Sequence, residues 1–304
     1  MKILIAALAV CTLAHPLPLA AQRAPARRTQ VVMLGTGTPN PDPDRSGPAV
    51  AIVVDSSVYI VDAGPGIVRR VAAAARTTKL RALAMPNLKI AFLTHLHSDH
   101  TVGLPDLMLS AWVLGRTVPL EVYGPPGTKN MVEHLQAAYA EDIDVRLHRG
   151  EPSNKTGYVT HPHEILPGVV YQDSLVKVTA FAVPHGKWEH AYGYRFDTPD
   201  RSIVISGDTS PSDAVADACH GCDVLVHEVI TEAHLAVRTP DWQAYHRAYH
   251  TPAPELGRVA AKAKPKLLVL YHLIPTGFNE AELLGEVRRG FKGRVIVGRD
   301  LGVY

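Results

Sequence analysis

Short apolar runs alternate along the chain with segments in which apolar residues recur at helical spacing. The runs predict strands, and the helical spacing predicts helices. Strands are expected at residues 31–34, 49–54, 57–61, 88–93, 120–123, 175–183, 191–196, 203–206, 224–226, 267–270 and 294–297. Helices are expected at residues 66–75, 102–114, 211–218, 253–263 and 280–291. Strands and helices interleaved in this way predict a layered α/β fold.

One long segment, residues 149–171, breaks this alternation. It is rich in Gly, Pro, Asn and His, which favours a long surface loop. The sequence contains no repeat at a short fixed period and no low-complexity linker. A chain of 304 residues, of which 46% are hydrophobic and 20% charged, can bury one large core. We therefore expect a single domain over residues 22–304.

The N-terminal segment is typical of a secretory signal peptide. One lysine, Lys2, precedes an apolar stretch at residues 3–14, two prolines and the small residues Ala20 and Ala21. Such a segment is too short to remain as a membrane span. We expect residues 1–21 to be removed and the mature protein to be periplasmic or secreted. In an oxidising compartment, the Cys219-His-Gly-Cys222 pair most simply forms a short disulfide.

The net charge of the chain does not indicate a partner, whereas its high histidine content is unusual. The chain has 31 basic and 29 acidic residues, a formal net charge of +2 that removal of Lys2 lowers to +1. No long basic run is present, so electrostatics alone does not suggest nucleic acid. Sixteen histidines is a high count, and most of them lie beyond residue 94. This enrichment indicates metal or acid-base chemistry.

A His-x-His-x-Asp-His motif follows the strand expected at residues 88–93. His95 and His97 point the same way, so they can hold one metal ion, while Asp99 and His100 on the next turn face a neighbouring ion. Imidazole and carboxylate groups both suit zinc. A cluster of solvated turn histidines is the alternative, but four ligand-type residues seldom coincide at this spacing.

Further candidate ligands stand at the ends of later strands, where open α/β sheets place their sites. They are His185, Asp208 and His272. Each alone would more often be an ordinary strand-end polar residue, but with the first motif they complete two metal sites. The first site is expected to contain His95, His97 and His185, and the second Asp99, His100 and His272, with Asp208 bridging both.

Together these motifs resemble the metallo-β-lactamase superfamily, in particular its branch of ribonuclease Z and zinc-dependent arylsulfatases. The shared motifs are L-G-T-G-T-P at 34–39, V-D-A-G at 61–64, T-H-L-H-S-D-H at 94–100, S-G-D-T at 206–209, V-H-E at 226–228 and Y-H-T at 249–251. The resemblance implies a four-layer αββα sandwich and two Zn²⁺ ions per chain that acidify a bridging water. It also implies catalytic roles for Asp99, which would orient that water, and for Glu228 and His250 as a proton relay. Otherwise, His250 would be a surface histidine before a helix and Glu228 a strand-end carboxylate.

One difference from ribonuclease Z determines the function that we expect. The tRNA-gripping arm of that enzyme is missing, because only residues 197–201 separate two expected strands. The sequence therefore predicts an exported dinuclear zinc hydrolase of small phosphodiesters, aryl sulfates or related esters. Nucleic acid is not an expected partner, and a homodimer is left open. The alternatives are a ribonuclease Z-type tRNA 3′ endonuclease, a β-lactamase or lactonase, and a non-catalytic metal-binding protein.

Two tryptophans are candidates for the walls of the site. Trp188 follows the strand that ends at His185, and Trp242 precedes His250. Either could stack on an aromatic leaving group, or both could be ordinary packing residues.

Overall fold

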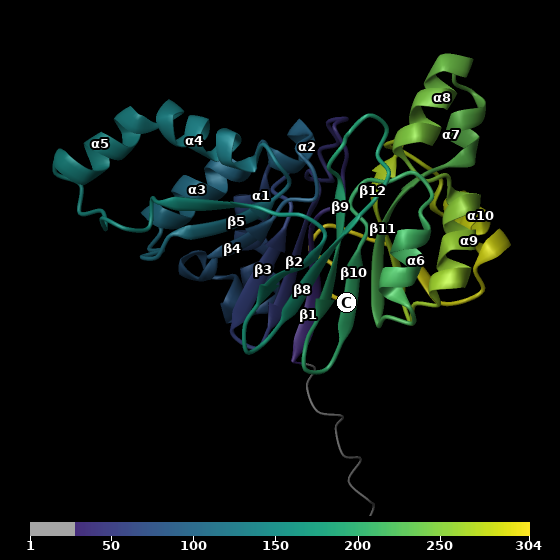
Figure 1. The fold of residues 1–304 in the computed structure, drawn as a ribbon, viewed down its shortest axis with the longest axis horizontal. Helices are drawn as coiled ribbons and strands as arrows, with labels where there is room; N and C mark the ends of the chain where they lie inside the picture. The colour runs from purple at the N-terminus through teal and green to yellow at the C-terminus, as the bar shows by residue number, and fades with distance from the viewer. Residues whose placement is uncertain (1–27) are drawn as a thin grey trace, which may run out of the picture.

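The computed structural model describes residues 28–304 and has two β-sheets packed face to face (Figure 1). The first sheet contains, in spatial order, β1 (Thr29–Gly35), β2 (Ala49–Val54), β3 (Ser57–Val61), β4 (Ile90–Phe92), β5 (Leu120–Gly124) and β6 (Thr160–Glu164). The second runs from β7 (Gly168–Gln172) through β8 (Lys177–Ala182), β9 (Tyr192–Asp197), β10 (Ser202–Ile205), β11 (Val224–Ile230) and β12 (Leu268–Ile274) to β13 (Val295–Val297).

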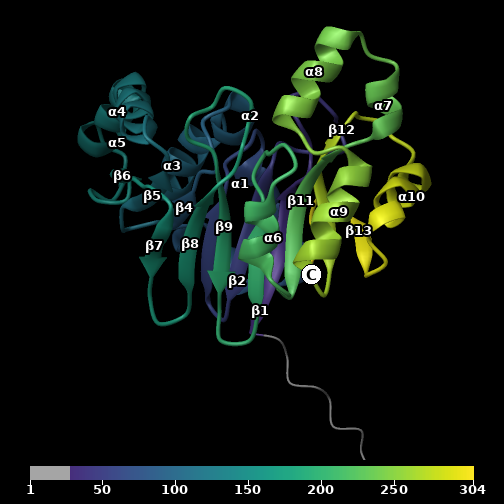
Figure 2. The ribbon, with the colours of Figure 1, turned by 45° about the vertical axis from the view of Figure 1, so that its right-hand side comes forward.

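Helices cover the outer faces of both sheets and one edge of the sandwich. They are α1 (Ile67–Thr78), α2 (Ser98–Thr101), α3 (Leu104–Val113), α4 (Thr128–Ala138), α5 (Ala140–His148), α6 (Asp213–Cys219), α7 (Glu232–Ala236), α8 (Pro240–Tyr249), α9 (Ala253–Ala263) and α10 (Glu280–Gly290). In Figures 1 and 2, α1 and α3 lie against the first sheet, and α6, α9 and α10 against the second. The arrangement is the expected four-layer αββα sandwich.

Three apolar layers hold the sandwich together, and strand periodicity produces them. Successive side chains of a strand point to opposite faces. Val31 and Met33 of β1 pack between the two sheets, whereas Val32 and Leu34 pack under the helices of the first sheet. A third cluster lies between the second sheet and α6, α9 and α10. Both sheets are thus apolar on both faces, which explains the continuous apolar runs in the sequence.

Parallel pairing brings several strand ends to one edge of the sandwich. Strands β3 to β6 pair in parallel, and so do β10 to β13. Both views show α2 and the paired helices α7 and α8 at this edge, and α4 and α5 project there as well (Figures 1 and 2). Residues that follow these strands therefore meet even though they lie far apart in the sequence.

The prediction of one long loop at residues 149–171 is wrong in part, because β6 and the start of β7 lie within this segment. Both are edge strands, and an edge strand tolerates Pro162, whose nitrogen cannot donate to a ladder. The helix expected at 102–114 begins earlier and is divided into α2 and α3 around Gly103. Helices α4, α5, α7 and α8 were not expected.

The cysteine prediction is confirmed, since Cys219 and Cys222 form a disulfide. Residues 1–21, expected to be a signal peptide, lie outside the described residues. The start of a single domain at residue 22 stays a prediction. No helix within residues 28–304 is long and apolar enough to cross a membrane.

Candidate metal centre

Elements from both sheets supply the predicted metal ligands. His95 and His97 follow β4, and the next turn, α2, carries Asp99 and His100. The loops after β8 and β10 contribute His185 and Asp208, and β12 contributes His272. All of these side chains except His97 are buried. The strand-end positions thus place all seven predicted ligands at one edge of the sandwich.

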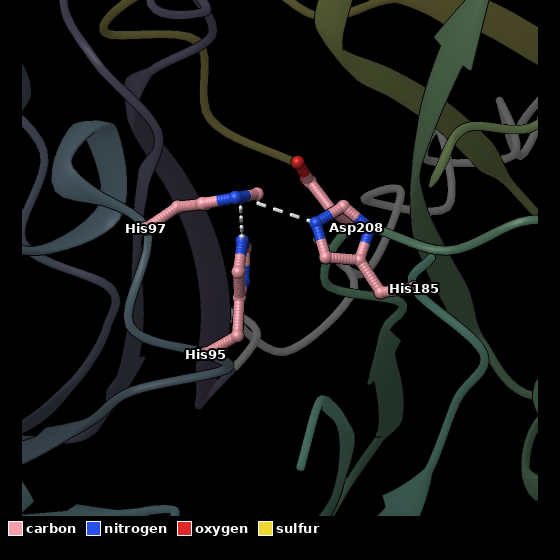
Figure 3. A group of neighbouring side chains, drawn as sticks. All are labelled: His95, His97, His185 and Asp208. Atoms are coloured by element: carbon pink, nitrogen blue, oxygen red, sulfur yellow. Dashed lines mark hydrogen bonds between the residues drawn. The ribbon is translucent and has the colours of Figure 1, made fainter. Parts of the chain in front are cut away.

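The first group of ligands is formed by three imidazoles. Figure 3 shows the rings of His95, His97 and His185 converging beside Asp208. His97 Nδ1 lies 2.9 Å from His95 Nε2 and 3.2 Å from His185 Nε2. The ligand atoms of these three residues and of Asp208 all lie within 4.8 Å of one another. The three histidines therefore surround one position at the centre.

The second group combines carboxylates with imidazoles. His272 Nε2 lies 3.2 Å from Asp99 Oδ2 and 3.3 Å from Asp208 Oδ2. His100 Nε2 is 3.4 Å from Asp208 Oδ1 and 3.6 Å from Asp99 Oδ2. A β-bulge in β12, opposite Glu228 and Val229 of β11, leaves His272 unpaired in the ladder with a positive φ of 45°.

The donor set fits divalent metal ions. Ligand bonds of about 2.0–2.2 Å in a tetrahedral site place neighbouring ligand atoms roughly 3.4 Å apart. The shortest separations in both groups, 2.9 to 3.6 Å, lie around that value, and the ligand atoms of each group all lie within 4.8 Å of one another. His100 Nε2 and Asp208 Oδ1 are also buried without a hydrogen-bond partner, which would be costly unless a further ligand satisfies them. The residues present therefore fit metal binding, and Asp208 adjoins ligands of both groups.

The first group is held neutral. Burial lowers the pKa of His95 well below its ordinary value and that of His185 to about 4, and it also lowers the pKa of His97. Neutral imidazole is the form that binds a metal. These three histidines therefore need no deprotonation before they bind one.

The second group is held charged. Burial opposes the charged form of His100, yet Asp208 and Asp62 outweigh it and raise its pKa well above the ordinary value. Burial is outweighed in the same way at His272, whose pKa is raised by Asp208 and Asp99. The opposite shift is seen at Asp208, where His272 and His100 overcome burial and hold the pKa well below the usual range. Without metal, this group is a buried cluster of ion pairs.

Hydrogen bonds from residues outside the predicted ligand set orient the ligands. Asp62 Oδ2 accepts from His100 Nδ1 at 2.8 Å, and Asp62 Oδ1 accepts from the backbone N–H of Thr94 at 2.8 Å. His185 Nδ1 donates to the carbonyl oxygen of Tyr249 at 2.8 Å. Such contacts fix ring orientation and ligand basicity. The signal for Asp62 was its place in V-D-A-G at the end of β3.

His250 and Glu228 lie side by side at the centre. His250 Nδ1 is 3.4 Å from Glu228 Oε2 and 4.0 Å from Asp208 Oδ2, and Glu228 Oε1 accepts from the backbone N–H of Thr251 at 2.6 Å. Burial lowers the pKa of His250 to about 4. Burial and the nearby Asp208 raise the pKa of Glu228 well above its ordinary range. Both shifts favour the uncharged forms, a neutral imidazole beside a protonated carboxyl group.

The two candidate tryptophans have different positions. Trp188 Nε1 donates to His97 Nε2 at 2.8 Å, so its ring stands directly against a predicted ligand. Trp242 lies on α8 and is 55% exposed. It lines a cavity that also contacts His250.

Comparison with known proteins places this site in a family. A family model described as "Beta-lactamase superfamily domain" matches residues 58–273. The chain is 32% identical over 276 residues to a ribonuclease Z from Mycobacterium sp. (strain KMS), which covers 90% of this chain and 94% of the relative. Among solved structures, the metallo-beta-lactamase fold protein YhfI from Bacillus subtilis aligns with a TM-score of 0.69 at 18% identity, covering 91% of this chain and 98% of that one. The short form of human tRNase Z aligns with a TM-score of 0.67 at 21% identity, covering 90% and 98%.

These relatives correct three expectations. An exported hydrolase of small esters is wrong as the main function, because the near full-length match is to a ribonuclease. The exclusion of nucleic acid as a partner is wrong for the same reason. The periplasmic or secreted location is wrong too, since it rested on an N-terminal pattern that would separate such an enzyme from tRNA precursors. The relatives named here give no support to an arylsulfatase activity, and a homodimer stays a prediction.

Neither the short turn between β9 and β10 nor the low net charge of the chain argues against a ribonuclease. The turn between β9 and β10 is as short as expected, with Thr198 N–H donating to Arg201 O. The ribonuclease Z match, however, covers 94% of the relative within 276 residues, which leaves little room for a long arm there. Net charge over the whole chain also does not measure the local contacts that bind a phosphate. The chain belongs to the metallo-β-lactamase superfamily and is a metal-dependent hydrolase of the ribonuclease Z-like kind.

Proposed function

We propose that the protein is a ribonuclease Z-type endonuclease that hydrolyses a phosphodiester bond near the 3′ end of precursor tRNA. The observation that carries this proposal is the match to a ribonuclease Z along nearly the whole of both chains. The metal centre supports it, because a phosphodiester needs charge neutralisation at its non-bridging oxygens and an activated water. A buried edge of the sandwich that gathers two carboxylates, Asp99 and Asp208, and several imidazoles supplies ligands for both tasks.

Two zinc ions are the proposed cofactors. His95, His97 and His185 would hold one ion, and Asp99, His100 and His272 the other, with Asp208 bound to both. When bound, such a pair acidifies a water at neutral pH and neutralises charge on the phosphate. Imidazole and carboxylate donors without a thiolate suit zinc, and they also accept other divalent ions. The choice of zinc over other divalent ions is therefore part of the proposal.

Asp99, Glu228 and His250 would orient the attacking water and transfer a proton to the leaving group. Asp99 Oδ2 lies within reach of both histidines of the second group and would orient the attacking water. Burial favours the protonated form of Glu228, which faces His250 Nδ1 and would pass its proton through the imidazole to the departing ribose oxygen. With the carboxyl group as the donor, the relay needs no histidinium ion.

Cleavage of a precursor tRNA with a 3′ extension tests the proposal. Zinc-loaded protein is expected to release the extension as one fragment by a single endonucleolytic cut. Asp208→Ala serves as the inactive control, because it removes a ligand from both groups. If the loaded wild-type protein leaves precursor tRNA intact while hydrolysing aryl phosphodiesters, the ribonuclease assignment fails and the metal chemistry stands.

His250→Ala tests the relay separately. It should retain both metal ions yet slow cleavage strongly, because the ribose oxygen is a poor leaving group that needs a proton. An aryl phosphodiester with a good leaving group should be affected much less. Equal losses on the two substrates would exclude a proton-donating role. Loss of metal in this variant would make His250 a ligand instead, consistent with its position beside Asp208 and His272.

A further inference from the structure

Helix α8 carries an aromatic stripe that the rest of the described chain covers only in part. Trp242, Tyr245, His246 and Tyr249 recur at the i, i+3, i+4 and i+7 positions of one helical face. No residue of α8 is buried, and Trp242 and Tyr245 are 55% and 41% exposed. An amphipathic helix normally packs such a face into the core. Helix α8 lies at the edge of the sandwich that carries the metal centre (Figure 2), and Trp242 and Tyr245 remain exposed there.

The stripe is ordered by contacts within itself and with the metal centre. The Tyr245 and Tyr249 rings stack at a centroid distance of 4.4 Å, and Trp242 meets the Tyr245 ring edge-to-face at 5.5 Å. Tyr249 packs 5.0 Å from the His185 ring and directly over Gly186, where a Cβ would collide with it. The aromatic face is therefore fixed in position relative to a predicted metal ligand.

A cavity of about 370 Å³ separates the stripe from the opposite wall of the site. Trp242, Tyr245 and His246 form one side, and the loops at residues 38–40 and 274–276 form the other. His250 lies in the same lining, so the cavity opens onto the proposed proton relay. We call this cavity the α8 pocket. Burial lowers the pKa of His246 to about 4, so the aromatic side of the pocket is uncharged.

A cation stands at the rim of the pocket. Arg238 is exposed, lines the pocket and donates from Nε to His234 Nε2 at 3.0 Å. No carboxylate within residues 28–304 forms an ion pair with it. An arginine without an anionic partner next to an exposed aromatic surface is suited to a phosphate adjoining a stacked base.

We propose that the α8 pocket binds one nucleobase of the RNA adjacent to the cleaved phosphate, stacked on Trp242, with Arg238 holding a neighbouring phosphate. This inference rests on the proposed ribonuclease function and names a recognition element within it. A pocket of this volume takes one base rather than a helix or a strand of a partner. Its aromatic side provides stacking, and Thr38 and Asn40 on the opposite side provide polar groups for the edge of the base.

Removing single bases from the substrate tests the proposal. Zinc-loaded wild-type protein would be assayed on RNAs in which each nucleotide around the cut is replaced in turn by an abasic one. One position should raise KM roughly tenfold, as expected for a lost stacking contact, while the others change it little. Trp242→Ala should raise KM for the intact RNA by a similar factor. In that variant, the same abasic position should have no additional effect.

Two further variants separate stacking from a general disturbance. Trp242→Phe should recover most of the affinity, because phenylalanine also offers a ring face. Tyr139→Ala, which removes another exposed aromatic residue at the start of α5, should leave KM unchanged. Zinc content and melting temperature should match the wild type in all three variants.

The outcomes distinguish this inference from the function on which it rests. If the wild type cuts every abasic RNA with the KM of the intact RNA, the pocket holds no base, although the ribonuclease function stands. If Trp242→Ala and an abasic position have fully additive effects, that base is bound elsewhere and the proposal is overturned. If the loaded protein cuts no RNA, the proposed function fails and the pocket assignment falls with it.

Discussion

The two halves of the metal centre use similar side chains in opposite charge states. The half formed by His95, His97 and His185 is neutral, because burial disfavours imidazolium and its carboxylate neighbours do not outweigh burial. In the other half, His100 and His272 sit against carboxylates that keep them protonated. We call these the neutral half and the charged half. Asp208 contacts both.

A metal ion that binds therefore requires a different proton transfer in each half. The charged half must release protons from His100 and His272 before their nitrogens can bind. The neutral half has no such requirement, but Trp188 donates to His97 Nε2, so a neutral His97 carries its proton on Nδ1, the nitrogen that faces His95 and His185. Binding through Nδ1 requires this proton to move. The comparison shows that ligand identity alone does not determine how readily each position fills.

The largest effect is expected from Asp208→Ala, which removes the only residue shared by both halves. Loss of a supporting residue outside the ligand set typically costs about tenfold to a hundredfold in metal affinity or activity, so loss of a shared ligand should cost more than about a hundredfold in kcat/KM. Metal content and cleavage rate measure it. An Asp208→Ala protein that retains both ions at wild-type affinity would show that the halves are independent.

Asp62→Asn should weaken the charged half more than the neutral half. Asp62 raises the pKa of His100 and accepts from its Nδ1. The amide loses the negative charge while nearly preserving shape, and a loss of about tenfold to a hundredfold in metal affinity follows. Competition with a chelator measures the two affinities. Asp223→Asn, just before β11 and bonded to Lys266, is the matched control and should change neither.

How much of this was predictable differs between the two halves. Of the neutral half, His95 and His97 stand two residues apart after a strand, so a local pattern predicts them as a pair. Of the charged half, the ligands Asp99, His100 and His272 were predicted as well, but the β-bulge that accommodates His272 and the pairing of Asp62 with His100, 38 residues away, were not. A bulge and a pairing of distant strands are tertiary features that a local pattern does not contain. The same holds for α8, whose aromatic spacing alone would predict a buried face.

Metal binding should release protons, and chiefly from the charged half. Because the pKa values of His100 and His272 are raised by neighbouring carboxylates, filling that half should release protons from these two imidazoles. Affinity there should fall as pH is lowered, because the proton competes with the metal. An indicator dye in weak buffer measures the release. Metal uptake without proton release would mean that the charged half is not charged.

The smallest expected effect is optical and belongs to the neutral half. Metal binding at His97 Nδ1 moves a proton to Nε2, where it meets the Trp188 N–H, so the Trp188 contact must break. Tryptophan emission should change when the first ion binds. Trp188→Phe should abolish most of that change, while Trp242→Phe, on α8, should preserve it. An unchanged signal in Trp188→Phe would place the responding tryptophan elsewhere.

Native mass spectrometry of the zinc-loaded protein tests most directly the claim that two unlike halves share one carboxylate. The wild type should carry two ions per chain at neutral pH, and acidification should remove one of them, from the charged half, before the other. In Asp62→Asn the same ion should be lost at a lower chelator concentration than in the wild type. A wild-type protein that binds one ion under every condition, or that loses two ions together as pH falls, would contradict this account of the centre.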